Sequence, residues 1–510
     1  MSALTTADAL PGSSRKGRRT SLTAHLAGVT LLFLAPGMLV SAAVEAGAGG
    51  EEVVSLVVSA AVVGTVGAVV WRSTVIPERL TVTASLAAVA ITWVTASVGG
   101  ALPFVLADTF PVLDDALFES ISGFTGTGST VLSPIEGTSR GILFWRSMTQ
   151  WYGGMGMVVL AVSVLPFLGI GGMDLMRAES PGPSSDRLAP RVSETARRLW
   201  VVYGGFTVLS AVALMVVGMS LYDAVVHAFT VVSTGGLSPY NDSIGHFDSV
   251  SVEAVIVVLM LIGGTSFALH WEAVTGHPGA YLRSPMFRVY MSVFAIGCVI
   301  ITFLLVTDDF TLGASIRAAV FNVATLVTST GYGTSDFTLW VPAAQLVLLA
   351  IMIGGGMAGS TAGGMKLVRL RLAFGIVVRE LRRVRHPHAV LPVRIGSSPT
   401  PDPIVARVAG YVALFVFILI VGTVVLSLLG ADLVTAAGGA VTTMSNMGPG
   451  LGEAGPASNF LVFSRPARGV LMLLMVVGRL EIIPVMVLVG LLVRPLSEPA
   501  RAVRRRRPRR

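Results

Sequence analysis

A short turn rich in glycine and hydroxyl side chains recurs four times along this chain, and it constrains the fold more than any other feature. The copies occupy residues 125–128, 232–235, 328–331 and 445–448. Each copy follows a short amphipathic segment and precedes a long apolar one. Recurrence at intervals of about one hundred residues predicts four copies of one structural unit.

Long apolar segments place these units in a membrane. Of the 510 residues, 53% are hydrophobic and 13% are charged, whereas about a quarter of the residues in soluble domains are charged. Many apolar segments exceed the roughly 20 residues that a helix needs to span a bilayer. The single cysteine, Cys298, excludes an intrachain disulfide. We therefore predict an all-α polytopic membrane protein.

Charged residues indicate the orientation of the chain. The net charge is +8, and the basic residues cluster in alternate loops, which is typical of cytoplasmic loops rather than of a nucleic-acid surface. Acidic residues gather in the opposite loops. The arginine-rich tail is interpreted as an anchor on anionic membrane lipids, and no nucleic-acid partner is expected. Both termini are predicted to be cytoplasmic, with ten spans between them.

The chain divides into a helix pair and four repeats. Residues 22–43 are long enough to span a bilayer and lack a clear cleavage site, so the first helix is expected to be retained rather than removed as a signal peptide. Each repeat is expected to contain an outward helix, a pore helix that ends at the turn, and a helix that returns. The predicted pore helices are 115–124, 223–232, 315–327 and 433–444. The predicted segments are a cytoplasmic N-terminus (1–20), the helix pair (21–78), repeat 1 (79–198), repeat 2 (199–284), repeat 3 (285–400), repeat 4 (401–496) and a basic cytoplasmic tail (497–510).

Four polar turns at membrane depth favour an ion filter around a pseudo-fourfold pore. Non-helical backbone cannot face lipid, so it must lie inside protein or around water. Carbonyl oxygens of four converging loops can replace the hydration shell of a cation, and glycine lets successive carbonyls point the same way. None of the turns contains a carboxylate, which suits K⁺ better than Ca²⁺ or Mg²⁺. The predicted filter residues are Thr125, Gly126, Thr127, Gly128, Val232, Ser233, Thr234, Gly235, Thr328, Ser329, Thr330, Gly331, Ser445, Asn446, Met447 and Gly448.

Six motifs in and around these turns resemble those of a known family. They are FESISGFT at 118–125, QWYGGMG at 150–156, RAESPGP at 177–183, FALH at 267–270, GSTAGGMK at 359–366 and NMGPGLG at 446–452. Over residues 80–495 the chain resembles the Trk/Ktr/HKT superfamily of K⁺ transporters, most closely the Trk-type membrane subunit of bacteria. The extra N-terminal helix pair is similar to the Trk-type branch and unlike the shorter Ktr type.

The resemblance implies K⁺ uptake through one filter glycine per repeat, Gly128, Gly235, Gly331 and Gly448. Plant relatives that favour Na⁺ can carry serine at the first of these positions, so Gly128 favours K⁺. The family also implies a multi-pass protein of the bacterial plasma membrane and a homodimer with one pore per protomer. It implies a separate cytoplasmic regulatory subunit that binds a nucleotide (NAD or ATP/ADP) and docks on basic faces such as 379–394. No nucleotide-binding motif is evident in this chain, and no covalent cofactor is expected.

Two further features are interpreted as gates. Glycines at 353–364 disfavour a helix, which predicts an unwound gating loop, followed by a cytoplasmic segment at 366–397; close packing of small residues is the alternative. Arg479 lies in the last apolar segment, where a charge usually faces a cavity or a partner; snorkelling to the interface is the alternative. In the family such a loop blocks the pore and such an arginine is an electrostatic barrier. The predicted gate residues are Gly354, Gly355, Gly356, Gly359, Ser360, Thr361, Gly363, Gly364 and Arg479.

Other functional classes fit less well. A secondary carrier of an organic solute is expected to have inverted repeats, whereas these four repeats share one orientation. An enzyme is not expected, because the histidines nearest a filter turn, His227 and His246, have no evident catalytic companion. Passive flow and Na⁺- or H⁺-coupled symport of K⁺ both remain open.

Overall fold

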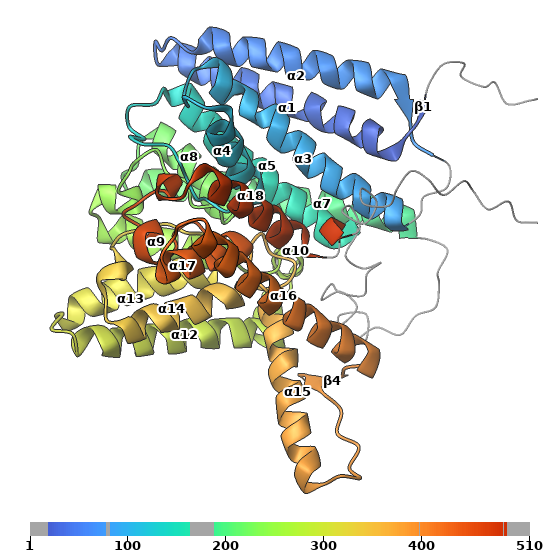
Figure 1. Cartoon of the computed structure of the whole chain (residues 1–510), viewed down its shortest axis with the longest axis vertical. Helices are drawn as coiled ribbons and strands as arrows, with labels where there is room; N and C mark the ends of the chain where they lie inside the picture. Colours follow the sequence, from blue (N-terminus) through green and yellow to red (C-terminus); the bar gives the residue numbers. More distant parts are fainter. Residues whose placement is uncertain (1–18, 78–81, 164–187, 397, 483, 487–510) are drawn as a thin grey trace, which may run out of the picture.

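The computed structural model describes residues 19–77, 82–163, 188–396, 398–482 and 484–486, and it is almost entirely helical (Figure 1). Two small sheets of two residues per strand accompany the helices in these ranges. One pairs β1 (Arg19–Thr20) with β2 (Thr74–Val75) in parallel. The other pairs β3 (Arg394–Ile395) with β4 (Ser398–Pro399) antiparallel. The all-α prediction is confirmed.

An N-terminal helix pair lies on one side of the bundle. Helix α1 (Leu22–Gly47) packs on α2 (Val53–Ser73), and the blue helices of Figure 1 show this arrangement. Helix α1 also contacts α3 (Val82–Leu106) and α5 (Arg140–Ser163). A Cβ atom at Gly28 would lie only 2.7 Å from the backbone nitrogen of Trp71. Small residues therefore let the two backbones approach closely, as is common where helices pack in a membrane.

A pattern of long helix, short helix and returning helix recurs four times. The first unit contains α3 (Val82–Leu106), α4 (Leu113–Thr125) and α5 (Arg140–Ser163). The second contains α7 (Leu188–Val216), α8 (Leu221–Val232), η2 (Ser243–Phe247), α9 (Val250–Gly263), α10 (Phe267–Val274) and α11 (Ala280–Arg283). The third contains α12 (Pro285–Val306), α13 (Leu312–Val327), η3 (Phe337–Leu339), α14 (Pro342–Gly354) and α15 (Leu367–Arg385). The fourth contains α16 (Asp402–Leu428), α17 (Leu433–Met444), η4 (Gly452–Ala454), η5 (Phe460–Val462) and α18 (Arg465–Leu480).

The short helices α4, α8, α13 and α17 are the predicted pore helices. Three of them begin at a polar cap: Ser220, Thr311 and Asp432 accept hydrogen bonds from backbone N–H groups of the first turn. Such caps satisfy groups that the helix itself leaves unpaired. The C-terminal half of each pore helix is buried, and together they form the centre of the protein.

The returning segments differ from the single helices predicted for them. The returning segment of the second repeat is two helices, α9 and α10, bent by 100°. In the fourth repeat, α18 ends at Leu480, and the next residue, Glu481, has a positive φ of 60°. Six described helices are long and apolar enough to span a membrane, or seven if the bent pair is one span. Among the returning segments, α9 and α10 are bent, and α14 and α18 have only 13 and 16 residues. The count of ten spans stays a prediction, since parts of the chain lie outside the described residues.

Helix α15 projects away from the bundle (orange in Figure 1) and leads to the β3–β4 hairpin. This helix spans Leu367–Arg385, so it begins before the basic face predicted at 379–394 and ends within it. The predicted cytoplasmic N-terminus up to residue 18, the motif at 177–183 and the basic tail 497–510 lie outside the described residues.

Candidate functional site

The four polar turns meet at one place in the middle of the protein. A Cβ atom at Gly128 would lie 2.2 Å from the carbonyl oxygen of Gly235 and 3.5 Å from the Cα of Gly448. A Cβ at Gly331 would lie 2.7 Å from the backbone nitrogen of Gly448. Backbones this close leave no room for side chains, which is why glycine recurs at these positions. The convergence that the sequence predicted is present in the structure.

The backbone follows the same path in each turn. One residue of each turn adopts a left-handed conformation: Gly126, Thr234, Ser329 and Asn446 have φ of 66°, 52°, 51° and 50°. The next residue donates its N–H to a carbonyl five residues earlier in all four copies: Thr127 to Ser122, Gly235 to Thr230, Thr330 to Thr325 and Met447 to Thr442.

This register corrects the second turn by one residue. The position equivalent to Gly128, Gly331 and Gly448 is Gly236, rather than Gly235 as predicted. Gly236 has a φ of 73°, and a Cβ there would lie 2.0 Å from the carbonyl oxygen of Thr330. Val232, predicted to lie in the turn, is the last residue of α8. The second turn therefore spans 233–236.

Threonine hydroxyls lie beside the turns in hydrogen-bonded pairs. The Oγ1 atoms of Thr125 and Thr127 are 2.7 Å apart, and so are those of Thr328 and Thr330. Thr125 and Thr328 also donate to carbonyls of the preceding pore helix. These side chains therefore brace the first and third turns against their own pore helices. Carbonyl ends of the four pore helices carry partial negative charge toward the turns, which favours a cation there.

A cavity of about 320 Å³ lies against all four glycines that share one register, Gly128, Gly236, Gly331 and Gly448. Other lining residues come from the loops that follow each turn, including Ser129, Tyr240, Gly333 and Pro456. The chain thus has a hollow of polar backbone on the side of the turns opposite the gating segment.

The predicted gating segment is unwound and lies against the turns. Residues 355–366 are not helical, which confirms the prediction from the glycine content. Gly363 donates its N–H to the Ser329 hydroxyl at 2.5 Å, and Gly364 donates to the carbonyl of Ser445 at 2.8 Å. The Thr361 hydroxyl donates to the carbonyl of Val232 at 3.0 Å. The segment therefore contacts three of the four repeats at their pore-helix ends.

Arg479 approaches the same segment from α18. Its side chain is 2% exposed, so the alternative of snorkelling to the interface is wrong. One Nη donates to the carbonyl of Thr361 at 2.8 Å and the other to the carbonyl of Gly153 at 3.3 Å. A buried guanidinium thus bridges the unwound segment and the returning helix of repeat 1.

Comparison with known proteins identifies this architecture. A family model described as TrkH, cation transport protein, matches residues 57–494. This chain belongs to the TrkH family. It is 38% identical over 405 residues to the Trk system potassium uptake protein TrkH of Escherichia coli K12, covering 78% of this chain and 83% of that protein. It is 37% identical over 423 residues to TrkI of Halomonas elongata, covering 82% and 85%.

A solved structure supports the assignment. The crystal structure of the potassium transporter TrkH from Vibrio parahaemolyticus matches with a TM-score of 0.85 and 32% sequence identity, over 93% of this chain and 98% of that chain. The resemblance drawn from the six motifs is therefore confirmed. So is the architecture of four repeats around a pore with an additional helix pair.

Sequence reasoning missed a buried ion pair beside the unwound segment of this TrkH-family chain. Arg369, near the start of α15, contacts Glu481 at 2.7 Å, and both side chains are buried. Lys366 donates to the carbonyl of Ala362 and has a φ of 70°. The two residues of the ion pair are 112 positions apart in the sequence. The available signal was an acidic residue within an apolar segment.

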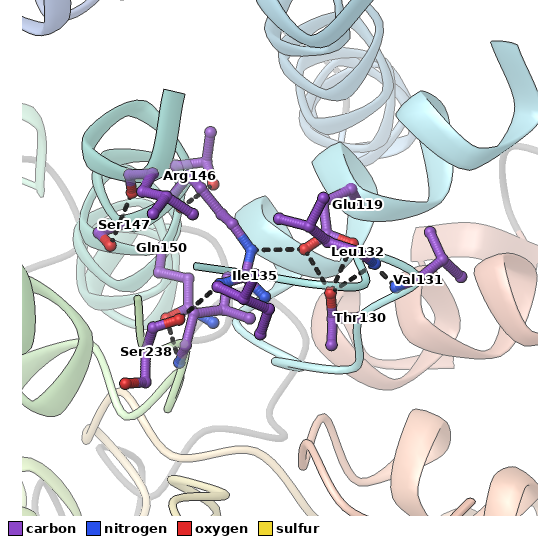
Figure 2. Close-up of polar contacts among 12 residues, drawn as sticks. Glu119, Thr130, Val131, Leu132, Ile135, Arg146, Ser147, Gln150 and Ser238 are labelled. Atoms are coloured by element: carbon purple, nitrogen blue, oxygen red, sulfur yellow. Dashed lines mark hydrogen bonds and ion pairs between the residues drawn. The ribbon is translucent and has the colours of Figure 1, made fainter. Parts of the chain in front are cut away.

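Polar residues behind the first two turns were also missed as site residues. Arg146 and Gln150 come from α5, and Glu119 comes from α4 (Figure 2). The Arg146 Nε lies 2.6 Å from a Glu119 oxygen, and both side chains are buried. The sequence quoted Glu119 and Gln150 only as parts of family motifs, although their polarity inside apolar helices was a signal of its own.

Proposed function

We propose that this chain takes up K⁺ across the bacterial plasma membrane through a ring of backbone carbonyls formed by the four turns. The observation that carries the proposal is the common backbone path of the four turns, which meet within van der Waals distance. Backbone oxygens held in this way can replace the hydration shell of a cation. The relatives from Escherichia coli and Halomonas elongata are named potassium uptake proteins, which supports the same ion.

The chemistry of the ring favours a monovalent ion. The turns contribute backbone carbonyls and hydroxyls, and none of their residues is a carboxylate. Divalent cations favour carboxylates or retain several waters. The C-terminal ends of four pore helices add partial negative charge without a fixed anion. A cation can therefore bind weakly enough to leave.

A second part of the proposal concerns gating: residues 355–366 and Arg479 form the gate of the pore. The segment lies directly beneath three turns, held by hydrogen bonds to Ser329, Ser445 and Val232. A positive guanidinium beside it repels a passing cation. Opening then requires the segment to move and the Arg479–Thr361 bond to break.

The regulatory proposal concerns α15. Its last turns expose Arg382, Arg383 and Arg385 outside the bundle, which suits an acidic cytoplasmic partner. We propose that this partner is a separate regulatory subunit that binds a nucleotide, NAD or ATP/ADP, and that the chain works as a homodimer with both termini in the cytoplasm. A displacement of α15 by the partner would move the gating segment directly, because α15 begins where the unwound segment ends.

The testing experiment is ⁸⁶Rb⁺ uptake into liposomes that contain the purified chain. Uptake that K⁺ inhibits strongly and Na⁺ inhibits weakly is the expected result. Uptake no greater than that of empty liposomes, in both the presence and the absence of a K⁺ gradient, would contradict the proposed function. Adding a Na⁺ or H⁺ gradient in the same assay separates passive flow from coupled transport.

A further inference from the structure

Three polar side chains form a bracket behind the first two turns, which we define as Glu119, Arg146 and Gln150. Arg146 and Gln150 are four residues apart on α5, so they lie on one face of that helix. Arg146 is 2% exposed, Gln150 0% and Glu119 1%. Polar groups buried this deeply are retained only where they are well bonded.

Gln150 reaches the second turn from behind. Its Nε2 donates to the carbonyl oxygen of Gly235 at 2.7 Å, and its Oε1 accepts the N–H of Leu237 at 3.1 Å. The side-chain amide therefore pairs with the backbone as a neighbouring strand would. A Cβ atom at Gly235 would lie 2.3 Å from the amide carbon of Gln150, so the two residues are too close for any side chain at position 235.

Arg146 continues the bracket and joins it to the first turn. Its Nη1 donates to the carbonyl of Ser238 at 2.9 Å, and its Nε contacts Glu119 at 2.6 Å. Glu119 in turn accepts the Thr130 hydroxyl at 2.9 Å and the N–H of Val131 at 3.0 Å. Figure 2 shows the chain of contacts running from the loop after the first turn to the loop after the second.

The same contacts concern the filter, because the Gly235 carbonyl oxygen lies beside the first turn. It is 2.2 Å from the position that a Cβ atom at Gly128 would occupy. A carbonyl oxygen has two lone pairs, and Gln150 takes one of them. The hydrogen bond from Gln150 lowers the negative electrostatic potential that this oxygen presents to a cation. Selectivity between K⁺ and Na⁺ depends on the number and field strength of the coordinating carbonyls, and a weaker field favours the larger ion.

We propose that Gln150 and Arg146 are positioning residues that set the preference of the filter for K⁺ over Na⁺, by fixing the second turn against the first and by weakening the field of the Gly235 carbonyl. This inference rests on the proposed function. It predicts an effect on ion preference that a purely structural role would not produce.

Gln150→Met is the first test, because methionine has a similar size and donates no hydrogen bond. Uptake of ⁸⁶Rb⁺ is measured at several concentrations with K⁺ or Na⁺ as competitor. We expect the ratio of the Na⁺ to the K⁺ inhibition constant to fall about tenfold, the effect of losing one or two buried hydrogen bonds. The ratio compares two competing ions in the same variant, so a change in overall uptake does not by itself alter it.

Arg146→Lys is the second test and keeps the buried charge beside Glu119. A lysine has one nitrogen and cannot replace the planar fork that serves both Glu119 and Ser238. The same fall in the inhibition ratio is expected. Ser147→Ala is the matched control, because Ser147 is buried on the same helix and its hydroxyl donates only to the Leu143 carbonyl of its own helix.

The outcomes separate the two proposals. An unchanged inhibition ratio in both Gln150→Met and Arg146→Lys overturns the positioning role while the proposed function stands. A ratio that changes equally in Ser147→Ala also overturns it, since the effect would then belong to the helix in general. If the unaltered chain does not favour Rb⁺ over Na⁺, the proposed function fails and this inference fails with it.

Discussion

The guanidinium of Arg479 donates a hydrogen bond of 2.8 Å to the carbonyl oxygen of Thr361. Arg479 lies in the last turn of α18 of the fourth repeat, and Thr361 lies in the unwound segment of the third. The bond therefore fastens the candidate gate to a different repeat. A hydrogen bond to a charged group contributes about 1.5–3 kcal/mol, which is enough to decide between a closed and an open segment.

Arg479→Ala is expected to increase ⁸⁶Rb⁺ flux into liposomes by about tenfold, because both the bond and the repelling charge are lost. Arg465→Ala is the control, since this arginine begins the same helix and its side chain is 63% exposed. Flux that stays at the wild-type level in Arg479→Ala would contradict the barrier role.

Gly128→Ser is expected to lower the preference for K⁺ over Na⁺ in the same assay. Gly128 has a φ of 82°, and its Cβ would lie 2.2 Å from the Gly235 carbonyl oxygen, so the ring must shift. Gly137→Ser is the control, because the nearest atom to a Cβ there is 3.5 Å away. If Na⁺ competes equally well in Gly128→Ser and in the wild type, Gly128 is not a filter residue.

The register of the second turn is tested by comparing Gly236→Ala with Gly235→Ala. At Gly236 alanine is strained by the positive φ, which costs about 1–2 kcal/mol, and its Cβ also meets the backbone of Thr330. At Gly235 the three atoms nearest to a Cβ belong to the end of the Gln150 side chain rather than to backbone. We expect Gly236→Ala to reduce ⁸⁶Rb⁺ uptake more strongly. The reverse order would restore Gly235 as the filter glycine.

The buried pair of Arg369 and Glu481 gives a prediction about stability. Glu481→Gln leaves Arg369 without the compensating charge, which costs about 3–5 kcal/mol for a buried pair. Thermal unfolding of the purified protein in detergent should show a clear loss. Glu380→Gln is the control, because Glu380 is 52% exposed beside Arg379 and Arg383, and exposed pairs contribute less than about 1 kcal/mol. Equal losses in the two variants would argue against the buried pair.

Asp432, which caps α17, gives a prediction about pH. The Thr435 hydroxyl, together with the N–H groups of Thr435 and Val434, holds the pKa of Asp432 below its usual value. This stabilisation is present above the ordinary pKa of aspartate and is lost as the pH falls through the lowered pKa. Asp432→Ala should reduce stability by about 1 kcal/mol at neutral pH. The difference in unfolding temperature from wild type should shrink in strong acid, and a constant difference would rule out the charged cap.

The sequence by itself determined the features that depend on local pattern. Long apolar segments with few charges predicted a membrane protein, and the recurring turn predicted four repeats. The pore helix predicted at 433–444 has the same bounds as α17. The glycine-rich stretch predicted the unwound segment, because glycine is intrinsically poor in helices. Each of these follows from neighbours in the chain.

Tertiary structure alone decided the rest. Gly235 and Gly236 are adjacent glycines, so only the backbone dihedral angles and the hydrogen bond from Gly235 to Thr230 could say which one matches Gly128. The pairing of Glu481 with Arg369, and of Gln150 with the Gly235 carbonyl, joins residues 112 and 85 positions apart. The physical reason is that a buried polar group must find a partner in three dimensions, and one sequence does not say which distant group will lie beside it.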